Sequence, residues 1–168
     1  MSVTAIPPVA EPRLDLSSLA PDVYRAQARF SHAAGELFIA SGLSQALLEL
    51  IRIRVSQING CAFCLDMHTK DARHAGERED RIYVLSAWRE APFYDPVERA
   101  ALALAEAVTE VSAGQVPDEL WAEAAKVLNE AQLAAVVAAA AAINTWNRFA
   151  ISSRMTPGGY QPGRSHGA

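Results

Sequence analysis

The chain has 168 residues and a formal net charge of −4 at pH 7, and 51% of its residues are hydrophobic. A chain of this length folds as one domain without a disulfide or zinc site, so its two cysteines are free for chemistry. The negative balance excludes a nucleic-acid groove, and the most apolar run, residues 133–143, is shorter than the roughly 20 residues of a membrane span. Few aromatic residues, 7%, and abundant alanine favour an all-α fold.

Residues 1–20 are predicted to form an extended N-terminal arm. This segment holds Pro7, Pro8 and Pro12 and shows no lasting hydrophobic period, and such an arm can wrap a neighbouring subunit. Its acids and prolines stand where a signal peptide needs a basic start and an unbroken apolar run. We therefore expect a cytoplasmic protein, whose lone cysteine pair is held mainly as a dithiol and can cycle through a disulfide.

Residues 21–155 are predicted to form a single helical domain. Its first helix follows Pro21, ends near Gly42 and carries an apolar stripe at helical spacing. The stripe consists of Val23, Ala26, Phe30, Ala33, Leu37 and Phe38. Ser44 is placed to cap a second helix, which ends at the turn signal Asn59-Gly60.

The remaining helices are predicted from their caps and breakers. They cover about 61–76, 80–88, 95–112 and 117–128, and a last helix runs from residue 129 or 130 through the alanine-rich stretch. Asp95 followed by Glu98 is typical of a capping box. In the last helix, polar residues such as Asn144 and Asn147 are expected to make structural hydrogen bonds. Prolines and glycines from Thr156 onward predict a flexible C-terminal tail, residues 156–168.

Both cysteines lie in one short segment, Cys61-Ala-Phe-Cys64, and His68 follows four residues later. On a helix these three side chains share one face, because positions three and four apart are neighbours. Asn59-Gly60 places Cys61 at the helix start, where free amide groups and the helix dipole favour a thiolate. A dithiol beside a titratable base indicates a redox site.

Together with Glu49, these residues resemble a known family signature. Glu49, Cys61, Cys64 and His68 stand at the spacing E–x11–CxxC–xxx–H, which is similar to that of the alkylhydroperoxidase D-like and carboxymuconolactone decarboxylase superfamily. The resemblance covers roughly residues 16–157. It implies an all-α alkylhydroperoxidase D-like bundle of about six or seven helices, a homo-oligomer that is a trimer or a hexamer, and reduction of hydroperoxides through a cysteine pair, with no cofactor and no metal.

Roles for the four residues follow from the same resemblance. Cys64 would be the thiol that attacks the peroxide, and Cys61 the resolving thiol that meets an external dithiol reductant, a lipoyl or thioredoxin-like protein. His68 would be the base beside Cys64, and Glu49 a proton-relay carboxylate, for which we expect a raised pKa. One position departs from the alkylhydroperoxidase D pattern, because Phe63 stands where those proteins have a histidine, and this removes one relay group.

Other interpretations of the same residues stay open. The cysteines could bind zinc with two of His32, His68 and His74, although the spacing of a zinc finger is absent, or they could pack inertly in the core. Glu49 could form a surface ion pair with Arg52. For the whole chain, the alternatives to a peroxidase are a carboxymuconolactone decarboxylase-like lyase or other proton-transfer enzyme, and a redox-sensing interaction protein without efficient turnover.

Overall fold

The computed structural model describes residues 11–163, which contain nine α-helices, one short 3-10 helix and no strand. The prediction of an all-α fold is confirmed. The elements are α1 (Leu16–Leu19), α2 (Pro21–Ala40), α3 (Gln45–Asn59), α4 (Ala62–His74), α5 (Glu79–Tyr83), η1 (Leu85–Ala87), α6 (Pro96–Thr109), α7 (Val111–Gly114), α8 (Asp118–Ala125) and α9 (Glu130–Ser153). Within the described ranges, no helix is both long and apolar enough to cross a membrane.

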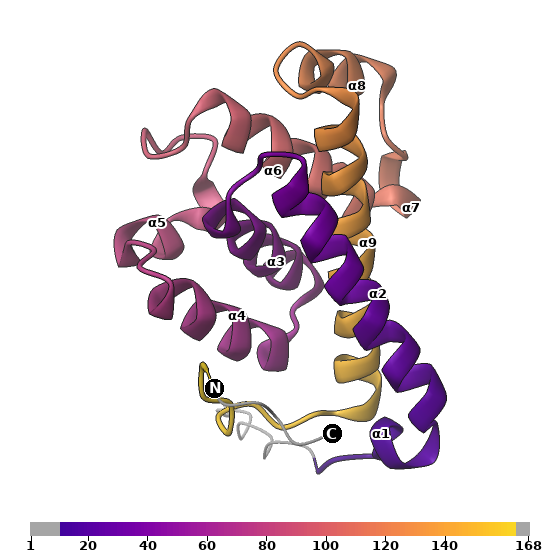
Figure 1. Cartoon of the computed structure of the whole chain (residues 1–168). Coiled ribbons are helices and arrows are strands. Elements are labelled where there is room, and N and C mark those ends of the chain that lie inside the picture. Colours follow the sequence, from indigo (N-terminus) through magenta and orange to yellow (C-terminus); the bar gives the residue numbers. More distant parts are fainter. Residues whose placement is uncertain (1–10, 164–168) are drawn as a thin grey trace, which may run out of the picture.

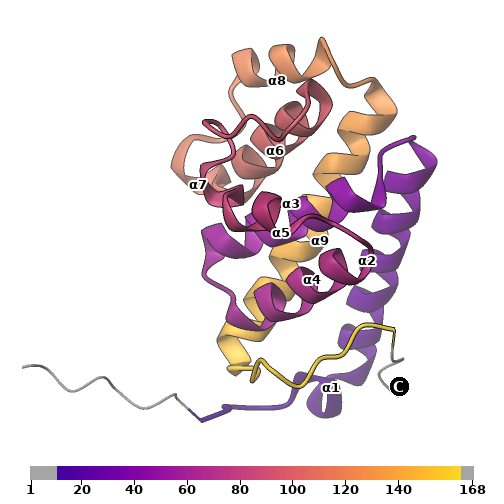
Figure 2. The ribbon, with the colours of Figure 1, turned by 90° about the vertical axis from the view of Figure 1, so that its left-hand side faces the viewer.

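Helix α3 is the centre of the bundle, as Figures 1 and 2 show. It packs against α4, α6 and α9, while the two longest helices, α2 and α9, lie side by side. Leu50, Ile51, Ile53 and Val55 of α3 are completely buried, and burial of each such side chain contributes roughly 1.5–3 kcal/mol. The segment that leads into the cysteines is therefore held firmly from several sides.

The helix starts follow the predicted caps. The Ser44 side chain accepts a hydrogen bond from the amide of Leu47 at the start of α3. Capping boxes begin α6, at Asp95 and Glu98, and α9, at Asn129 and Gln132. These local bonds satisfy amide groups that a helix N-terminus otherwise leaves free, so α3, α6 and α9 have a defined first residue, whereas α2 begins at Pro21 without a side-chain cap.

A left-handed glycine joins α3 to α4. Gly60 has a φ of 69° and ends α3, and the amide of Cys61 then donates to the carbonyl of Ser56 at 2.9 Å. A residue with a Cβ is disfavoured in this conformation, which explains the glycine of the Asn59-Gly60 pair. The turn delivers Cys61 directly to the N-terminal end of α4.

The first helix exposes part of its predicted apolar stripe. Phe38 and Ala34 are buried, as is Gln27, whose amide donates to the carbonyl of Ala142 in α9 at 2.9 Å. The stripe residues Val23, Phe30 and Leu37, by contrast, are exposed. Phe38 is thus the one buried residue of the predicted stripe, because α9 packs against the face of α2 that carries Gln27.

Two further segments differ from their predicted form. The predicted helix 80–88 divides into α5 and η1. The predicted extended arm contains one helical turn, α1, where Asp15 caps the chain by accepting from the amide of Ser17 at 2.9 Å. Residues 1–10 of the arm lie outside the described residues.

Residues 156–163 of the predicted C-terminal tail lie against α4. The amide of Gly158 donates to the carboxylate of Asp66 at 2.9 Å, and Lys70 donates to the carbonyl of Tyr160 at 3.2 Å. Figures 1 and 2 both show this yellow segment passing below α4. Proline and glycine prevent a helix here, as predicted, but hydrogen bonds to side chains of α4 fix the path instead. Residues 164–168 lie outside the described residues.

Replacing Gly60 with alanine is expected to destabilise the fold by about 1–2 kcal/mol, the cost of a left-handed conformation for a residue with a Cβ. A Cβ at this position would meet no atom within 4 Å, so the cost is conformational rather than steric. The measurement is the free energy of unfolding in urea. Gly114→Ala in α7 is the matched control, since Gly114 has no positive φ and also faces open space. Equal effects of the two substitutions would contradict this explanation of Gly60.

Candidate active site

The two cysteines occupy the first turn of α4. Cys61 is the N-cap residue of α4, and Cys64 follows one turn later on the same face. Each is a free cysteine and only 1% exposed. The predicted location at a helix start is confirmed, and burial removes the thiols from bulk water.

The two thiols share hydrogen bonds and therefore titrate as a pair. Hydrogen bonding from the Cys64 side chain lowers the pKa of Cys61 to about 7, although burial opposes this shift. Hydrogen bonding with Cys61, together with burial, raises the pKa of Cys64. Cys61 is consequently the thiol that ionises more readily near neutral pH, and Cys64 is the one that keeps its proton.

Asn147 of α9 is a site residue that the sequence analysis assigned only to structural hydrogen bonding. Its side chain lowers the pKa values of both cysteines. It is completely buried, donates to the hydroxyl of Ser56 at 3.0 Å and accepts from the amide of Asn59 at 2.8 Å. The signal in the sequence was a polar residue in an alanine-rich helix, but local patterns do not show that it faces the thiols.

Glu49 and His68 form a buried pair between α3 and α4. Their Oε2 and Nδ1 atoms are 2.9 Å apart, and the exposed fractions of the two residues are 2% and 6%. Arg52 and Gln45 both donate to the other carboxylate oxygen, at 2.7 and 2.9 Å. The ion pair between Glu49 and Arg52 is thus buried on the glutamate side and is not the surface pair considered as an alternative.

The pKa of Glu49 is lowered, and the prediction of a raised pKa is wrong. Burial alone would raise it, as that prediction assumed, but hydrogen bonding and charge from His68 and Arg52 outweigh the burial. Glu49 therefore stays a carboxylate at neutral pH, and it holds the His68 ring in one orientation.

The four predicted residues thus form two pairs, one of the cysteines at the start of α4 and one that joins His68 of α4 to Glu49 of α3. Cys61 and Cys64 hydrogen-bond with each other, and His68 hydrogen-bonds with Glu49. Cys64 and His68 are four residues apart on one helix, so their side chains lie along the same face. The arrangement offers a nucleophilic thiolate, a second thiol and a fixed imidazole within two helical turns.

Each thiol borders its own small cavity. Cys64 lines a cavity of about 250 Å³ whose other walls include Tyr24, Phe63, Met67 and Trp146. The rings of Tyr24 and Trp146 meet edge to face at 4.9 Å, which gives this cavity an aromatic wall. Cys61 lines a second cavity of about 210 Å³, and Arg154 is another of the residues that line it.

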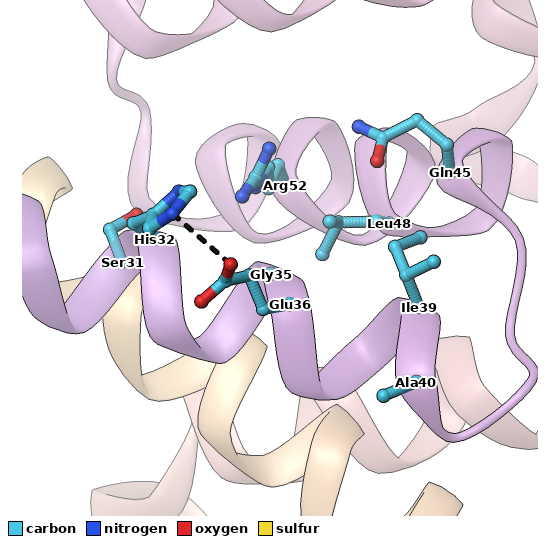
Figure 3. Close-up of a pocket in the computed structure, with 9 residues that line it drawn as sticks. All are labelled: Ser31, His32, Gly35, Glu36, Ile39, Ala40, Gln45, Leu48 and Arg52. Carbon is cyan, nitrogen blue, oxygen red and sulfur yellow. Dashed lines mark ion pairs between the residues drawn. The ribbon is translucent and has the colours of Figure 1, made fainter.

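A larger hollow lies away from the thiols, between α2 and α3. It measures about 620 Å³ and is shown in Figure 3, where His32 and Glu36 of α2 form an ion pair. Gln45 and Arg52 of α3 line it as well, and both of these also bind Glu49. The size of this hollow does not make it the reactive centre, because the cysteines do not line it.

The zinc alternative finds no support in the described residues. His32 pairs with Glu36 on an exposed face of α2, and His74 is exposed at the end of α4, whereas both cysteines are buried. One group could hold a cation by its spacing: Glu49, His68 and Asp71 have ligand atoms within 4.8 Å of one another. Hydrogen bonds from Arg52, Gln45, His68 and Tyr160 already satisfy these carboxylates.

The fold and site define a helical protein with a buried CxxC thiol pair and an adjacent histidine–glutamate pair. Comparison with solved structures finds the same helical fold. ATU0492 of Agrobacterium tumefaciens, a protein of unknown function provisionally assigned to antioxidant defence as an AhpD protein, is 34% identical, with a TM-score of 0.82 over 89% of this chain and all of that one. The debrominase Bmp8 is 21% identical, with a TM-score of 0.71 over 83% of this chain and 73% of its own, and shows likeness of fold alone.

The sequence comparisons agree with the structural ones. Protein YdfG of Bacillus subtilis (strain 168), which is uncharacterized, is 50% identical over 112 residues, 67% of this chain and 76% of YdfG. The model of the carboxymuconolactone decarboxylase family matches residues 21–107. The chain belongs to the carboxymuconolactone decarboxylase family and, within that superfamily, has the AhpD-like fold. The resemblance stated from the sequence is confirmed.

The pH dependence of alkylation tests the shared proton. Cys61 is expected to react with iodoacetamide with a midpoint near pH 7, because its pKa is lowered to about 7: below this pH it protonates and the rate falls. Cys64→Ala removes the chief hydrogen-bond donor and should move the midpoint upward, towards the ordinary value of about 8.5. Mass analysis identifies the modified residue. An unchanged midpoint in Cys64→Ala would contradict the pairing.

Proposed function

We propose that the chain is a thiol-dependent peroxidase that reduces organic hydroperoxides through Cys61 and Cys64. The proposal is carried by the buried thiol pair, in which the pKa of Cys61 is lowered to about 7 and Cys64 borders an apolar cavity. Aromatic and methionine side chains line that cavity, and such walls suit an alkyl or aryl hydroperoxide. The likeness to ATU0492, a protein of unknown function provisionally assigned to antioxidant defence, supports the proposal.

The proposed reaction balances as two displacement steps. A thiolate of Cys64 attacks one peroxide oxygen, the O–O bond breaks, and the alkoxide takes up a proton and leaves as an alcohol, while Cys64 becomes a sulfenic acid. Cys61 then attacks the Cys64 sulfur, the disulfide forms, and hydroxide leaves as water with one more proton. An external dithiol reduces the disulfide and is itself oxidised.

The Cys64 thiol must lose its proton before its sulfur can attack the peroxide. In the reduced pair this proton lies on Cys64, and its hydrogen-bond partner Cys61 can receive it. We propose that the imidazole of His68, one helical turn further along the same face of α4, takes the proton on. On pKa alone the reverse assignment, with Cys61 attacking and Cys64 resolving, would need no such transfer. The aromatic cavity beside Cys64 favours the first assignment.

His68 and Glu49 are proposed to handle protons rather than to bind substrate. The Glu49 carboxylate accepts a hydrogen bond from Nδ1 of His68 and fixes the imidazole ring. Nε2 of the ring is then left to exchange protons with the thiol and with the departing oxygen. The lowered pKa of Glu49 suits this task, because a charged carboxylate stabilises the imidazolium that forms when His68 takes a proton.

The proposed partners are a dithiol reductant of lipoyl or thioredoxin type and further copies of this chain, in a reducing cytoplasm. The exposed apolar residues Val23, Phe30 and Leu37 recur every seven residues along α2. Such a line on a helix is typical of a packing surface. We propose it as part of a homo-oligomer contact in a trimer or hexamer.

A second candidate function is proton transfer on a lactone, as in a decarboxylase of this family. The family match favours it, as does the buried His68–Glu49 pair, which needs no thiol to act as acid and base. Complete alkylation of both cysteines separates the candidates. Loss of hydroperoxide reduction supports the peroxidase, and lactone turnover that survives alkylation supports the lyase.

Single cysteine variants are expected to divide the reaction. Cys61→Ser should consume one equivalent of cumene hydroperoxide and accumulate a sulfenic acid on Cys64, with steady-state turnover lowered at least about 10²-fold. Cys64→Ser should consume none. Sulfenic acid trapping with mass analysis gives the modified residue.

A sulfenic acid on Cys61 in Cys64→Ser, with none on Cys64 in Cys61→Ser, would reverse the two roles. Full steady-state turnover in both variants would contradict the proposed function. Rapid oxidation of the wild type without recycling by any dithiol would instead favour a redox-sensing protein.

A further inference from the structure

The segment that follows α9 carries Tyr160 back to the reactive helix. The hydroxyl of Tyr160 donates to the carboxylate of Asp71 in α4 at 2.5 Å. Lys70 donates to the carbonyl of Tyr160, and Asp66 accepts from the amide of Gly158. These contacts from three residues of α4 determine where the Tyr160 ring lies, in the yellow segment of Figure 1.

Asp71 connects Tyr160 to the buried histidine–glutamate pair. It follows His68 by one helical turn on α4, and its carboxylate lies within 4.8 Å of ligand atoms of both Glu49 and His68. Burial, Asp71 and the charge of Glu49 all raise the pKa of Tyr160, so the phenol lies in the field of both carboxylates. Arg52, Glu49 and His68 are thus joined by hydrogen bonds, as are Asp71 and Tyr160, and the two groups approach each other to within 4.8 Å between α3 and α4.

We propose that Asp71 and Tyr160 are positioning residues that extend the His68–Glu49 pair into a proton relay reaching the C-terminal segment. The inference rests on the proposed peroxidase function. In that cycle the two departing oxygens take up two protons. The Cys64 thiol supplies one of them, and when Cys61 is already a thiolate the second must come from outside the thiol pair and is given back when an external dithiol reduces the disulfide. A path for one proton between the buried site and water is thus required in each such turnover.

The chemistry of the five groups suits this task. Glu49 and Asp71 are two acids within 4.8 Å of each other, and repulsion between two carboxylates is reduced by a hydrogen-bond donor on each. Arg52 donates a hydrogen bond to Glu49, and the neutral hydroxyl of Tyr160 donates one to Asp71. A phenol can both donate and accept, so it can pass a proton on without becoming a permanent charge. Lys70, the remaining charged group at this segment, is paired with Asp66.

The test compares Tyr160→Phe with Tyr83→Phe. Tyr83 is the matched control, because its hydroxyl also donates to a carboxylate at 2.5 Å, that of Glu79, but on an exposed surface of α5. Tyr160→Phe is expected to slow the single-turnover oxidation of the reduced protein by cumene hydroperoxide about tenfold and to change the pH profile of that rate. The hydroperoxide concentration that gives half of the maximal rate should stay unaltered. Asp71→Asn should act in the same direction, and Tyr83→Phe should leave rate and profile unchanged.

The possible results separate this inference from the proposed function. A wild type that consumes hydroperoxide while Tyr160→Phe equals Tyr83→Phe in rate and pH profile would overturn the relay and leave the peroxidase intact. A lowered unfolding temperature of Tyr160→Phe with an unaltered pH profile would make Tyr160 merely structural and would also overturn it. A wild type without hydroperoxide consumption would remove both proposals.

Discussion

The hydrogen bond between the side chains of Cys61 and Cys64 is the interaction on which the site depends. It lowers the pKa of Cys61 to about 7 despite burial and raises the pKa of Cys64, so that the two thiols titrate as a pair. The contact exists because Gly60 ends α3 in a left-handed conformation and leaves Cys61 at the N-cap of α4. A short turn in the backbone thereby sets the charge state of the thiol pair.

The rest of the bundle supports this contact from two sides. Alanine residues let α9 approach α3 closely, and Asn147 can then reach the thiols while its amide is satisfied by Ser56 and Asn59. On the other side, Glu49 of the central helix fixes His68. Large side chains on α9 would separate the helices, so the small residues and the buried polar ones act together.

Much of the fold could be predicted from the sequence, because its signals are local. Proline, glycine and cap residues such as Ser44 and Asp95 define helix ends within a few positions, and the spacing of Cys61, Cys64 and His68 defines a shared face. The errors arise where the partner of a residue is distant in the chain. The pKa of Glu49 depends on His68 in the next helix, and the path of the tail depends on side chains of α4, which no local pattern reveals.

The central claim is that the two thiols act as one redox pair, and intact mass analysis tests it most directly. Reduced wild-type protein is treated with one equivalent of cumene hydroperoxide, and its free thiols are then counted and its mass measured. We expect both thiols to disappear together, with a mass lower by two hydrogen atoms and an internal bond between Cys61 and Cys64. Two unchanged thiols, or one oxidised cysteine beside one that stays free, would contradict the account.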